Sequence, residues 1–421
     1  MQNPLYASLE DLLADPTVSR GLARLDARAP AMVATTMAWS RINSGSRETA
    51  GLARMAEALT ETYAALGPVE AVPIGPSQRV TAAGAVEAVA HPPALRIKVR
   101  PEAPLQVALT GHFDTVFPAS HPFQTPVLRS DGVLHGPGVA DMKGGLVVMA
   151  EALSALETLP FKDRIGFEVL LSPDEEIGSP ASAPLLADLG RRSHVGMTYE
   201  PGLPDGGLVS ARKGSAIFAL ILRGRAAHVG RAFDDGRSAI LAGAQAATAL
   251  GALNGRCEGV TVNVGAIEGG GPVNVVPDTA VVRFNVRVPD DEAATWALAE
   301  VDRIVAAISD LDGIAAELTG GFTRPPKPLT PAQEQLVDWT ERLAAILGQT
   351  VRFAASGGVC EGNNLAAAGC PNIDTLGPCG GALHSEDEFA IASSFGPRAQ
   401  LSFLMLAAFA SGLHDVRELR R

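Results

Sequence analysis

Three strand-like runs in the first half of the chain each lead into acidic or histidine side chains. Residues 107–110 lead to His112 and Asp114, residues 167–172 to Glu175 and Glu176, and residues 197–199 to Glu200. Helix-like patterns separate the runs, and strands that alternate with helices indicate a mostly parallel sheet covered by helices. Open α/β sheets bind ligands at the carboxyl ends of their strands. The sequence therefore predicts that these side chains meet at one edge of the sheet.

A glycine-rich turn, residues 136–145, places Asp141 just before an apolar helix expected at residues 144–156. Taken alone, this stretch also fits an ordinary turn in which an aspartate caps the helix. The histidine and carboxylates on either side of it favour a second role, in which Asp141 bridges two metal ions. His384, which follows a predicted strand at residues 372–376, joins the same set.

With 421 residues, the chain is too long for one ordinary core. Between residues 211 and 320 we expect strands at 215–222, 260–267, 280–288 and 314–318, with helices at 237–250 and 291–308. This βαββαβ order is typical of a ferredoxin-like α+β sandwich. We predict an α/β catalytic domain with a mixed, mostly parallel sheet, formed by residues 1–209 and 322–421. A lid, residues 210–321, is inserted between these two parts of the domain.

Composition excludes several classes of protein. The net charge of −12 argues against nucleic acids and acidic membrane surfaces as partners. The first thirty residues lack the pattern of a signal peptide, and no apolar run approaches the ~20 residues of a membrane span. The four cysteines have no CxxC spacing, which favours reduced thiols. We expect a cytoplasmic protein.

The candidate residues match the needs of a dinuclear metal site. Two divalent ions ~3.5–4 Å apart can share a bridging water, lower its pKa and polarise a carbonyl. Asp141 would bridge the ions, His112 and Glu200 would complete one, and Glu176 and His384 the other. Nitrogen and oxygen ligands without cysteine suit two Zn²⁺ per subunit, with Co²⁺ or Mn²⁺ as possible substitutes.

Two further acids have expected roles beside the ligands. Asp114 can accept the second ring proton of His112 and so fix its tautomer. On an extended segment, neighbouring side chains point to opposite sides. Glu176 would then ligate, while Glu175 faces the water as general base.

These motifs resemble those of the dinuclear-zinc peptidases that include glutamate carboxypeptidase, aminoacylase, acetylornithine deacetylase and succinyl-diaminopimelate desuccinylase. The matching segments are Gly-His-Phe-Asp-Thr-Val from residue 111, Gly-Val-Ala-Asp-Met-Lys-Gly-Gly from residue 138, Ser-Pro-Asp-Glu-Glu-Ile-Gly from residue 172 and Leu-His-Ser from residue 383. The resemblance covers nearly the whole chain. It implies the metal and base roles given above, and a cis peptide bond between Asp141 and Met142.

The resemblance also implies roles for the inserted domain. His228 would reach the active site of a partner subunit and stabilise the oxyanion, which makes the protein a homodimer joined through this domain. Asn274 and Arg287 would hold the terminal carboxylate of the substrate, a task that suits the bidentate guanidinium. A locally packed loop histidine and a surface strand arginine remain the alternatives for His228 and Arg287.

One segment departs from the pattern of the family. Where many relatives have Gly-Gly-Gly-Thr-Asp or Gly-Gly-Ser-Asp lining the pocket, this chain has Gly-Gly-Val-Cys-Glu-Gly-Asn-Asn at residues 357–364. Cys360 there fits a buried structural cysteine or a pocket-lining thiol. We predict a carboxypeptidase that acts on a small acyl-amino acid or peptide with a free carboxylate, closest to the glutamate branch. An N-acyl amino acid deacylase is the main alternative, and a non-catalytic relative is a minor one.

Overall fold

The larger part of the molecule is built on a six-stranded sheet. Its strands lie in the order β1 (Val69–Val72), β4 (Ala94–Val99), β8 (Gly166–Ser172), β5 (Gln106–His112), β9 (Val195–Thr198) and β18 (Asn372–Ile373). In this computed structural model, which describes residues 4–420, the four strands from β8 to β18 are parallel, and β1 and β4 are antiparallel to their neighbours. The predicted mixed, mostly parallel sheet is confirmed.

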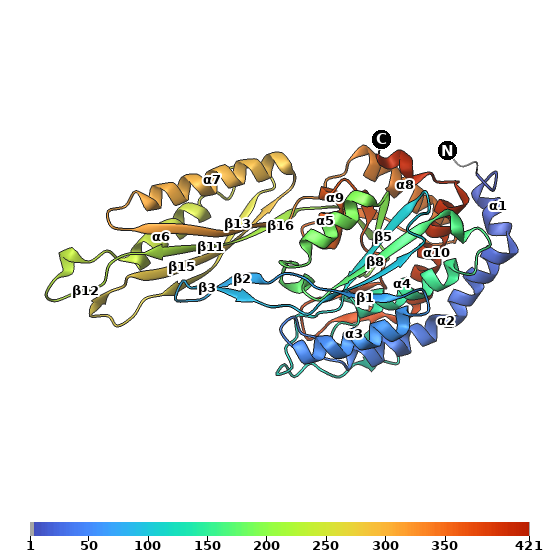
Figure 1. The fold of residues 1–421 in the computed structure, drawn as a ribbon, viewed down its shortest axis with the longest axis horizontal. Helices are drawn as coiled ribbons and strands as arrows, with labels where there is room; N and C mark the ends of the chain where they lie inside the picture. Colours follow the sequence, from blue (N-terminus) through green and yellow to red (C-terminus); the bar gives the residue numbers. More distant parts are fainter. Residues whose placement is uncertain (1–3, 421) are drawn as a thin grey trace.

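The sheet is buried on both faces, which explains why its strands are continuous apolar runs. Val107 and Leu109 of β5 join the large core on one face, whereas Ala108 joins a smaller cluster on the other with Leu186 and Leu365. The large core is shared with α2 (Pro16–Ser40), α4 (Lys143–Leu156) and α10 (Phe395–Ser411), and the smaller one with α5 (Ala183–Arg192) and α9 (Glu361–Ala367). Figure 1 shows these helices around the sheet.

The remaining helices of this part are α1 (Leu9–Ala14), α3 (Thr49–Tyr63) and α8 (Pro331–Ile346). Single turns of 3₁₀ helix occur as η1 (Lys162–Arg164), η2 (Glu175–Ile177), η3 (Phe233–Asp235), η4 (Ala392–Ser394) and η5 (Val416–Arg420). α2 begins at Pro16. Asp15 caps it by accepting a hydrogen bond from the backbone N–H of Thr17 at 2.7 Å, and proline at the first position suits a helix start.

A second unit has its own antiparallel sheet and its own core. The strands lie in the order β13 (Thr261–Gly269), β15 (Thr279–Val288), β11 (Gly214–Arg223) and β16 (Ala315–Arg324), and they pack against α6 (Ala239–Gly251) and α7 (Asp291–Ser309). The chain order of these elements is the βαββαβ order expected from the sequence. β16 continues to Arg324, beyond the boundary at residue 321 that the sequence analysis expects for this unit.

A hairpin from the larger part reaches the face of this second sheet that α6 and α7 leave uncovered. It consists of β2 (Ser77–Val80) and β3 (Val86–Val89), and Val80 packs in a small cluster with Ile221. The Arg223 guanidinium donates to the carbonyl of Gly84 at 2.7 Å, and that of Arg283 donates to the carbonyl of Val80 at 2.6 Å. In Figure 1 the hairpin extends from the larger part to β15.

Three small sheets complete the structure. β10 (Leu208–Arg212) pairs with β17 (Phe353–Ser356), and β12 (Ala227–His228) pairs with β14 (Val275–Val276). The third sheet has the order β19 (Gly380–Gly381), β20 (Phe389–Ile391), β7 (Val133–His135) and β6 (Val127–Leu128). It places the loop with His384 beside the turn with Asp141, because the loop joins β19 to β20 and the turn follows β7.

No helix within residues 4–420 combines the length and the apolar character that a membrane crossing requires. The four cysteines are free thiols, and all except Cys257 are buried.

The close approach of α4 to the end of β9 gives a test of the packing. A methyl group added at Gly145 would lie 1.9 Å from the carbonyl oxygen of Tyr199. We expect Gly145→Ala to lower the free energy of unfolding by about 1–3 kcal/mol or more, since overpacking forces neighbouring groups to shift. The matched control is Gly251→Ala at the end of α6, where the added methyl meets nothing within 4 Å. Urea unfolding should find the control unchanged or slightly more stable, and equal stability of the two variants would contradict the packing.

Candidate metal centre

The ends of three parallel strands bring the first set of functional side chains together. β5 ends at His112, β8 is followed by the η2 turn with Glu175 and Glu176, and Glu200 lies two residues beyond β9. These strands are neighbours in the sheet, so their carboxyl ends lie at the same edge. This is the arrangement that the alternating sequence pattern predicted.

Asp141 lies between two groups of possible ligands. One group is His112, Asp141 and Glu200, and the other is Asp141, Glu176 and His384; within each group the ligand atoms lie within 4.8 Å of one another. Oδ1 of Asp141 is 3.0 Å from Nε2 of His112, and Oδ2 is 3.3 Å from Nε2 of His384. Each oxygen thus faces a different group, which is the geometry that a bridging carboxylate needs.

The donor set fits two Zn²⁺ ions. Both groups offer one histidine nitrogen, one terminal carboxylate and one oxygen of Asp141, a chemistry that zinc accepts. Within the groups, Oε2 of Glu176 is 3.0 Å from Nε2 of His384, and Oε1 of Glu200 is 3.8 Å from Nε2 of His112. The five candidate ligands named from the sequence therefore lie together, in two groups with the expected members.

Burial and mutual repulsion shape the protonation of this cluster in the metal-free protein. Burial, together with the charge of Asp141, raises the pKa of Glu176 to about 8 and that of Glu200 well above its usual value. Hydrogen bonds with Asp141 and Glu176 raise the pKa of His384 to about 11. Burial opposes protonation of His112, but hydrogen bonds with Asp114 and Asp141 raise its pKa well above the usual value. Protons therefore offset the carboxylate charge that metal ions would otherwise neutralise.

Asp114 connects the two parts of the site. Its Oδ1 lies 3.3 Å from Nδ1 of His112, as expected for an acid that orients the imidazole. The same carboxylate accepts the backbone N–H groups of Glu175 at 3.1 Å and Glu176 at 3.2 Å, and the hydroxyl of Ser46 at 2.7 Å. One buried acid thus fixes both a candidate ligand and the turn with the candidate base.

The local conformation at Glu175 differs from the expectation. The sequence argument placed Glu175 and Glu176 on an extended segment, but they begin the 3₁₀ turn η2. Their side chains nevertheless diverge: Glu176 faces His384, whereas Oε1 of Glu175 accepts a hydrogen bond from Arg324 at 2.7 Å. The turn arises because Asp114 holds both backbone N–H groups, a long-range contact that the local sequence does not reveal.

Glu388 is a residue of the site that sequence reasoning missed. Its buried carboxylate accepts backbone N–H groups of Gly138 at 3.0 Å, Ala140 at 3.0 Å and Asp141 at 3.1 Å. Burial and the nearby charge of Asp141 raise the pKa of Glu388 to about 7. Glu388 holds the glycine-rich turn in place, and the peptide bond between Asp141 and Met142 is cis, as the resemblance implied.

A cleft of about 420 Å³ opens over the candidate ligands. Its walls include Asp141, Glu175, Glu176, Glu200, His384, Arg212, Arg287, Arg324, Gly358 and Val359. Arg287, on β15 of the second unit, donates to Oδ1 of Asn285 at 2.9 Å and has no carboxylate partner among residues 4–420. Burial lowers the pKa of its guanidinium. The cleft therefore pairs the candidate metal ligands with a cation that is free to bind an anion.

His228 and Asn274 lie elsewhere. His228 is the last residue of β12, and the backbone N–H of Val229 donates to the carbonyl of Asn274 at 3.1 Å, so the two residues are close neighbours. Both are exposed, and β12 lies at the outer tip of the second unit, far from the six-stranded sheet (Figure 1). This chain does not bring them to its own metal ligands.

Cys360 has a structural role in residues 357–364, the segment that departs from the pattern of the family. Its buried thiol accepts the N–H of Gly362 at 3.3 Å at the start of α9, while Oδ1 of Asn363 accepts the N–H of Cys360 at 3.0 Å. Gly358 and Val359 line the cleft, but Cys360 does not. These contacts support a buried structural cysteine at position 360 and not a pocket-lining thiol.

The protonation of the cluster predicts how zinc binding depends on pH. Protons held by His384 and Glu176 at neutral pH must leave when zinc binds, so zinc affinity should rise as pH increases from 6 to 8. Calorimetric titration of metal-free protein in buffers with different ionisation enthalpies measures the protons released, and His384→Ala should release fewer. Binding heats that do not depend on the buffer would contradict this assignment.

The hydrogen bonds of Glu388 predict a second effect on the metal site. Glu388→Ala leaves three buried N–H groups beside Asp141 without a partner, and loss of such a supporting group lowers metal affinity by about 10–100-fold. The control is Glu386→Ala on the same loop, whose side chain is 65% exposed. Zinc competition assays should separate the two variants, and equal affinities would show that Glu388 does not support the turn.

Comparison with known proteins agrees with this geometry. Residues 108–407 match the model of the peptidase family M20/M25/M40. Succinyl-diaminopimelate desuccinylase of Stenotrophomonas maltophilia is 31% identical over 313 residues, which cover 68% of this chain and 79% of that enzyme. Carboxypeptidase G2 of Pseudomonas sp. is 24% identical over 308 residues, which cover 72% of this chain and 73% of that enzyme.

Solved structures share the fold. The M20 family metallo-carboxypeptidase Sso-CP2 of Sulfolobus solfataricus superposes with a TM-score of 0.69 at 14% identity, covering 90% of this chain and 99% of that one. Aminopeptidase PepT of Bacillus cereus superposes with a TM-score of 0.67 at 23% identity, covering 90% and 98%. This chain belongs to the peptidase family M20/M25/M40 and is a hydrolytic metallopeptidase or amidohydrolase.

Proposed function

We propose that this protein is a zinc-dependent carboxypeptidase that cleaves the amide bond to a C-terminal amino acid, with glutamate as the first candidate. The observation that carries the proposal is the cleft: Arg287, which has no carboxylate partner within residues 4–420, lines the same cavity as members of both groups of candidate ligands. A guanidinium binds a carboxylate through two hydrogen bonds. A substrate held there by its terminal carboxylate would extend its amide bond toward the ligands.

Glu175 is the proposed general base. When bound, two zinc ions would supply Lewis acidity for the amide carbonyl and a lowered pKa for the attacking water. Glu175 lines the cleft, and its Oε2 has no hydrogen-bond partner among residues 4–420. It would take a proton from the water and return it to the leaving amine. Asp114 supports this role because it holds the backbone of Glu175 and the ring of His112.

His228 and Asn274 are proposed to act in a homodimer. Their exposure at the tip of the second unit fits residues that complete the site of another subunit, where His228 would stabilise the oxyanion and Asn274 would help to hold the substrate carboxylate. In the same proposal, residues 210–321 form a lid and dimerisation domain between the two segments of the catalytic domain. The net charge of −12 and the free cysteines are consistent with a cytoplasmic location.

An N-acyl amino acid deacylase is the second candidate. The relatives above include the succinyl-diaminopimelate desuccinylase of Stenotrophomonas maltophilia, at 31% identity. A deacylase of this kind would use the same ligands and base and would differ in the lining of the cleft, where residues 357–364 depart from the pattern of many relatives.

Hydrolysis of a panel of substrates by zinc-loaded protein tests the proposal. The panel should contain N-acyl and peptidyl glutamates, acetylornithine and succinyl-diaminopimelate, with Glu175→Gln measured beside the wild type. We expect release of glutamate, and a loss of about a hundredfold or more in the variant, because a general base contributes about 10²–10⁴-fold. Glu87→Gln, in the exposed hairpin, is the matched control and should keep the rate of the wild type.

The outcomes separate the candidates. Cleavage of acyl-amino acids but not of glutamates would retain the site and replace the substrate. A Glu175→Gln variant as active as the wild type would remove Glu175 as the base. Zinc binding without any turnover on the panel would reject the proposed carboxypeptidase.

A further inference from the structure

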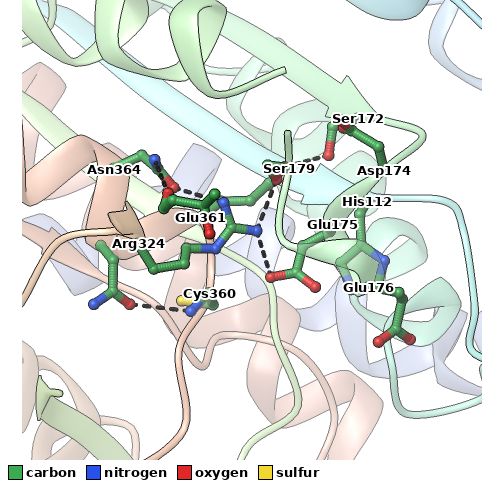
Figure 2. A network of polar contacts seen from close by, with 12 residues as sticks. His112, Ser172, Asp174, Glu175, Glu176, Ser179, Arg324, Cys360, Glu361 and Asn364 are labelled. Atoms are coloured by element: carbon green, nitrogen blue, oxygen red, sulfur yellow. Dashed lines mark hydrogen bonds and ion pairs between the residues drawn. The ribbon is translucent and has the colours of Figure 1, made fainter. Parts of the chain in front are cut away.

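Arg324 is a buried cation beside the cleft to which the proposed reaction assigns no role. It is the last residue of β16, and only 1% of its side chain is exposed. Its guanidinium donates to Oε1 of Glu175 at 2.7 Å, to the hydroxyl of Ser179 at 2.7 Å and to Oδ1 of Asn364 at 2.8 Å. Figure 2 shows Arg324 on one side of Glu175, with Glu176 and His112 on the other.

The ion pair with Glu175 helps to offset the cost of burying this cation, and the nearby carboxylate of Glu361 also contributes. A buried charge is costly unless an opposite charge lies beside it. Within residues 4–420, Glu175 is the carboxylate that forms an ion pair with Arg324. The other two partners are neutral and come from separate elements: Ser179 follows η2, and Asn364 lies in α9. The hydrogen bonds to these two residues fix the plane of the guanidinium independently of Glu175.

Glu175 depends on this contact in turn. Its backbone N–H is held by Asp114, but the hydrogen bond described for its side chain is the one from Arg324 to Oε1. Within residues 4–420 no hydrogen bond reaches Oε2, and Glu175 lines the cleft. A glutamate side chain with one oxygen fixed presents the other in a narrow range of directions, which is what proton transfer requires.

We propose that Arg324 is a positioning residue for the general base: it holds Oε1 of Glu175 so that Oε2 faces the substrate and the attacking water. This inference rests on the proposed function of Glu175. Direct binding of the substrate carboxylate is the competing role, because Arg324 also lines the cleft. The charge of Arg324 is already paired with Glu175 and only 1% of its side chain is exposed, whereas Arg287 has no carboxylate partner within residues 4–420, so we assign the substrate carboxylate to Arg287.

A double-mutant cycle tests the inference. Arg324→Met is made in the wild type and in Glu175→Gln, and kcat, KM and zinc content are measured on the substrate that the wild type cleaves best. We expect Arg324→Met to lower kcat by about 10–100-fold with less than about a threefold change in KM, because it disturbs the base but not substrate binding. In the Glu175→Gln background the same substitution should change the residual rate by less than about threefold, since residues that act as a unit are not additive.

Two milder variants apply if Arg324→Met does not fold. Arg324→Lys keeps the charge and should retain more activity than Arg324→Met. Asn364→Ala keeps the arginine but removes one of the hydrogen bonds that orient it, and should lower kcat by a smaller factor than Arg324→Met.

Arg398→Met is the matched control for Arg324→Met, because Arg398 is also buried but donates to the backbone carbonyl of Gly206 at 2.8 Å. It should lose stability and keep its kcat within about threefold of the wild type.

The possible failures are distinguishable. Equal losses from Arg324→Met in both backgrounds would assign Arg324 a structural role and overturn the inference. A raised KM with unchanged kcat would make it a substrate ligand instead. If the wild type cleaves nothing on the panel, or if Glu175→Gln remains fully active, the proposed function fails first and the inference falls with it.

Discussion

Asp141 is a buried carboxylate with a histidine on each side, and the rest of the site depends on that arrangement. Two further carboxylates, Glu176 and Glu200, lie close to it, and burial together with the charge of Asp141 raises their pKa values. Buried like charges remain together only where opposite charge is supplied. In the metal-free protein the protonated histidines supply part of it. Two divalent ions would supply more and would satisfy the same oxygens, so the electrostatics of the pocket themselves favour metal.

Such a cluster needs a rigid frame, and distant parts of the chain provide it. Strand ends fix His112 and the η2 turn, while Glu388 holds the backbone of Asp141 across 247 positions of sequence. Asp114 joins the strand end to the turn through two N–H groups. The site therefore forms only when the C-terminal segment has returned to the sheet. This explains how five candidate ligands from separate loops come together in two groups.

Sequence reasoning was effective where chemistry follows a strand directly. His112, Glu176 and Glu200 could be predicted because buried apolar runs precede them and their side chains are typical metal ligands. It failed where the function of a residue depends on a distant contact. Glu388 looks like one of several acids in a loop, and Arg324 stands beside a proline-rich stretch. Neither residue has a local signal, because the groups they bind lie far away in sequence.

The two arginines of the second sheet show how burial assigns different tasks to one side-chain type. Arg324 on β16 is paired with Glu175, and Arg287 on β15 keeps donors without a carboxylate partner among the described residues. Both strands belong to the same four-stranded sheet, in which β11 lies between them. On the proposed roles, one rigid sheet both holds the substrate carboxylate and orients the general base. A displacement of that sheet would then change substrate binding and proton transfer together, and the β2–β3 hairpin packed on its uncovered face resists such a displacement.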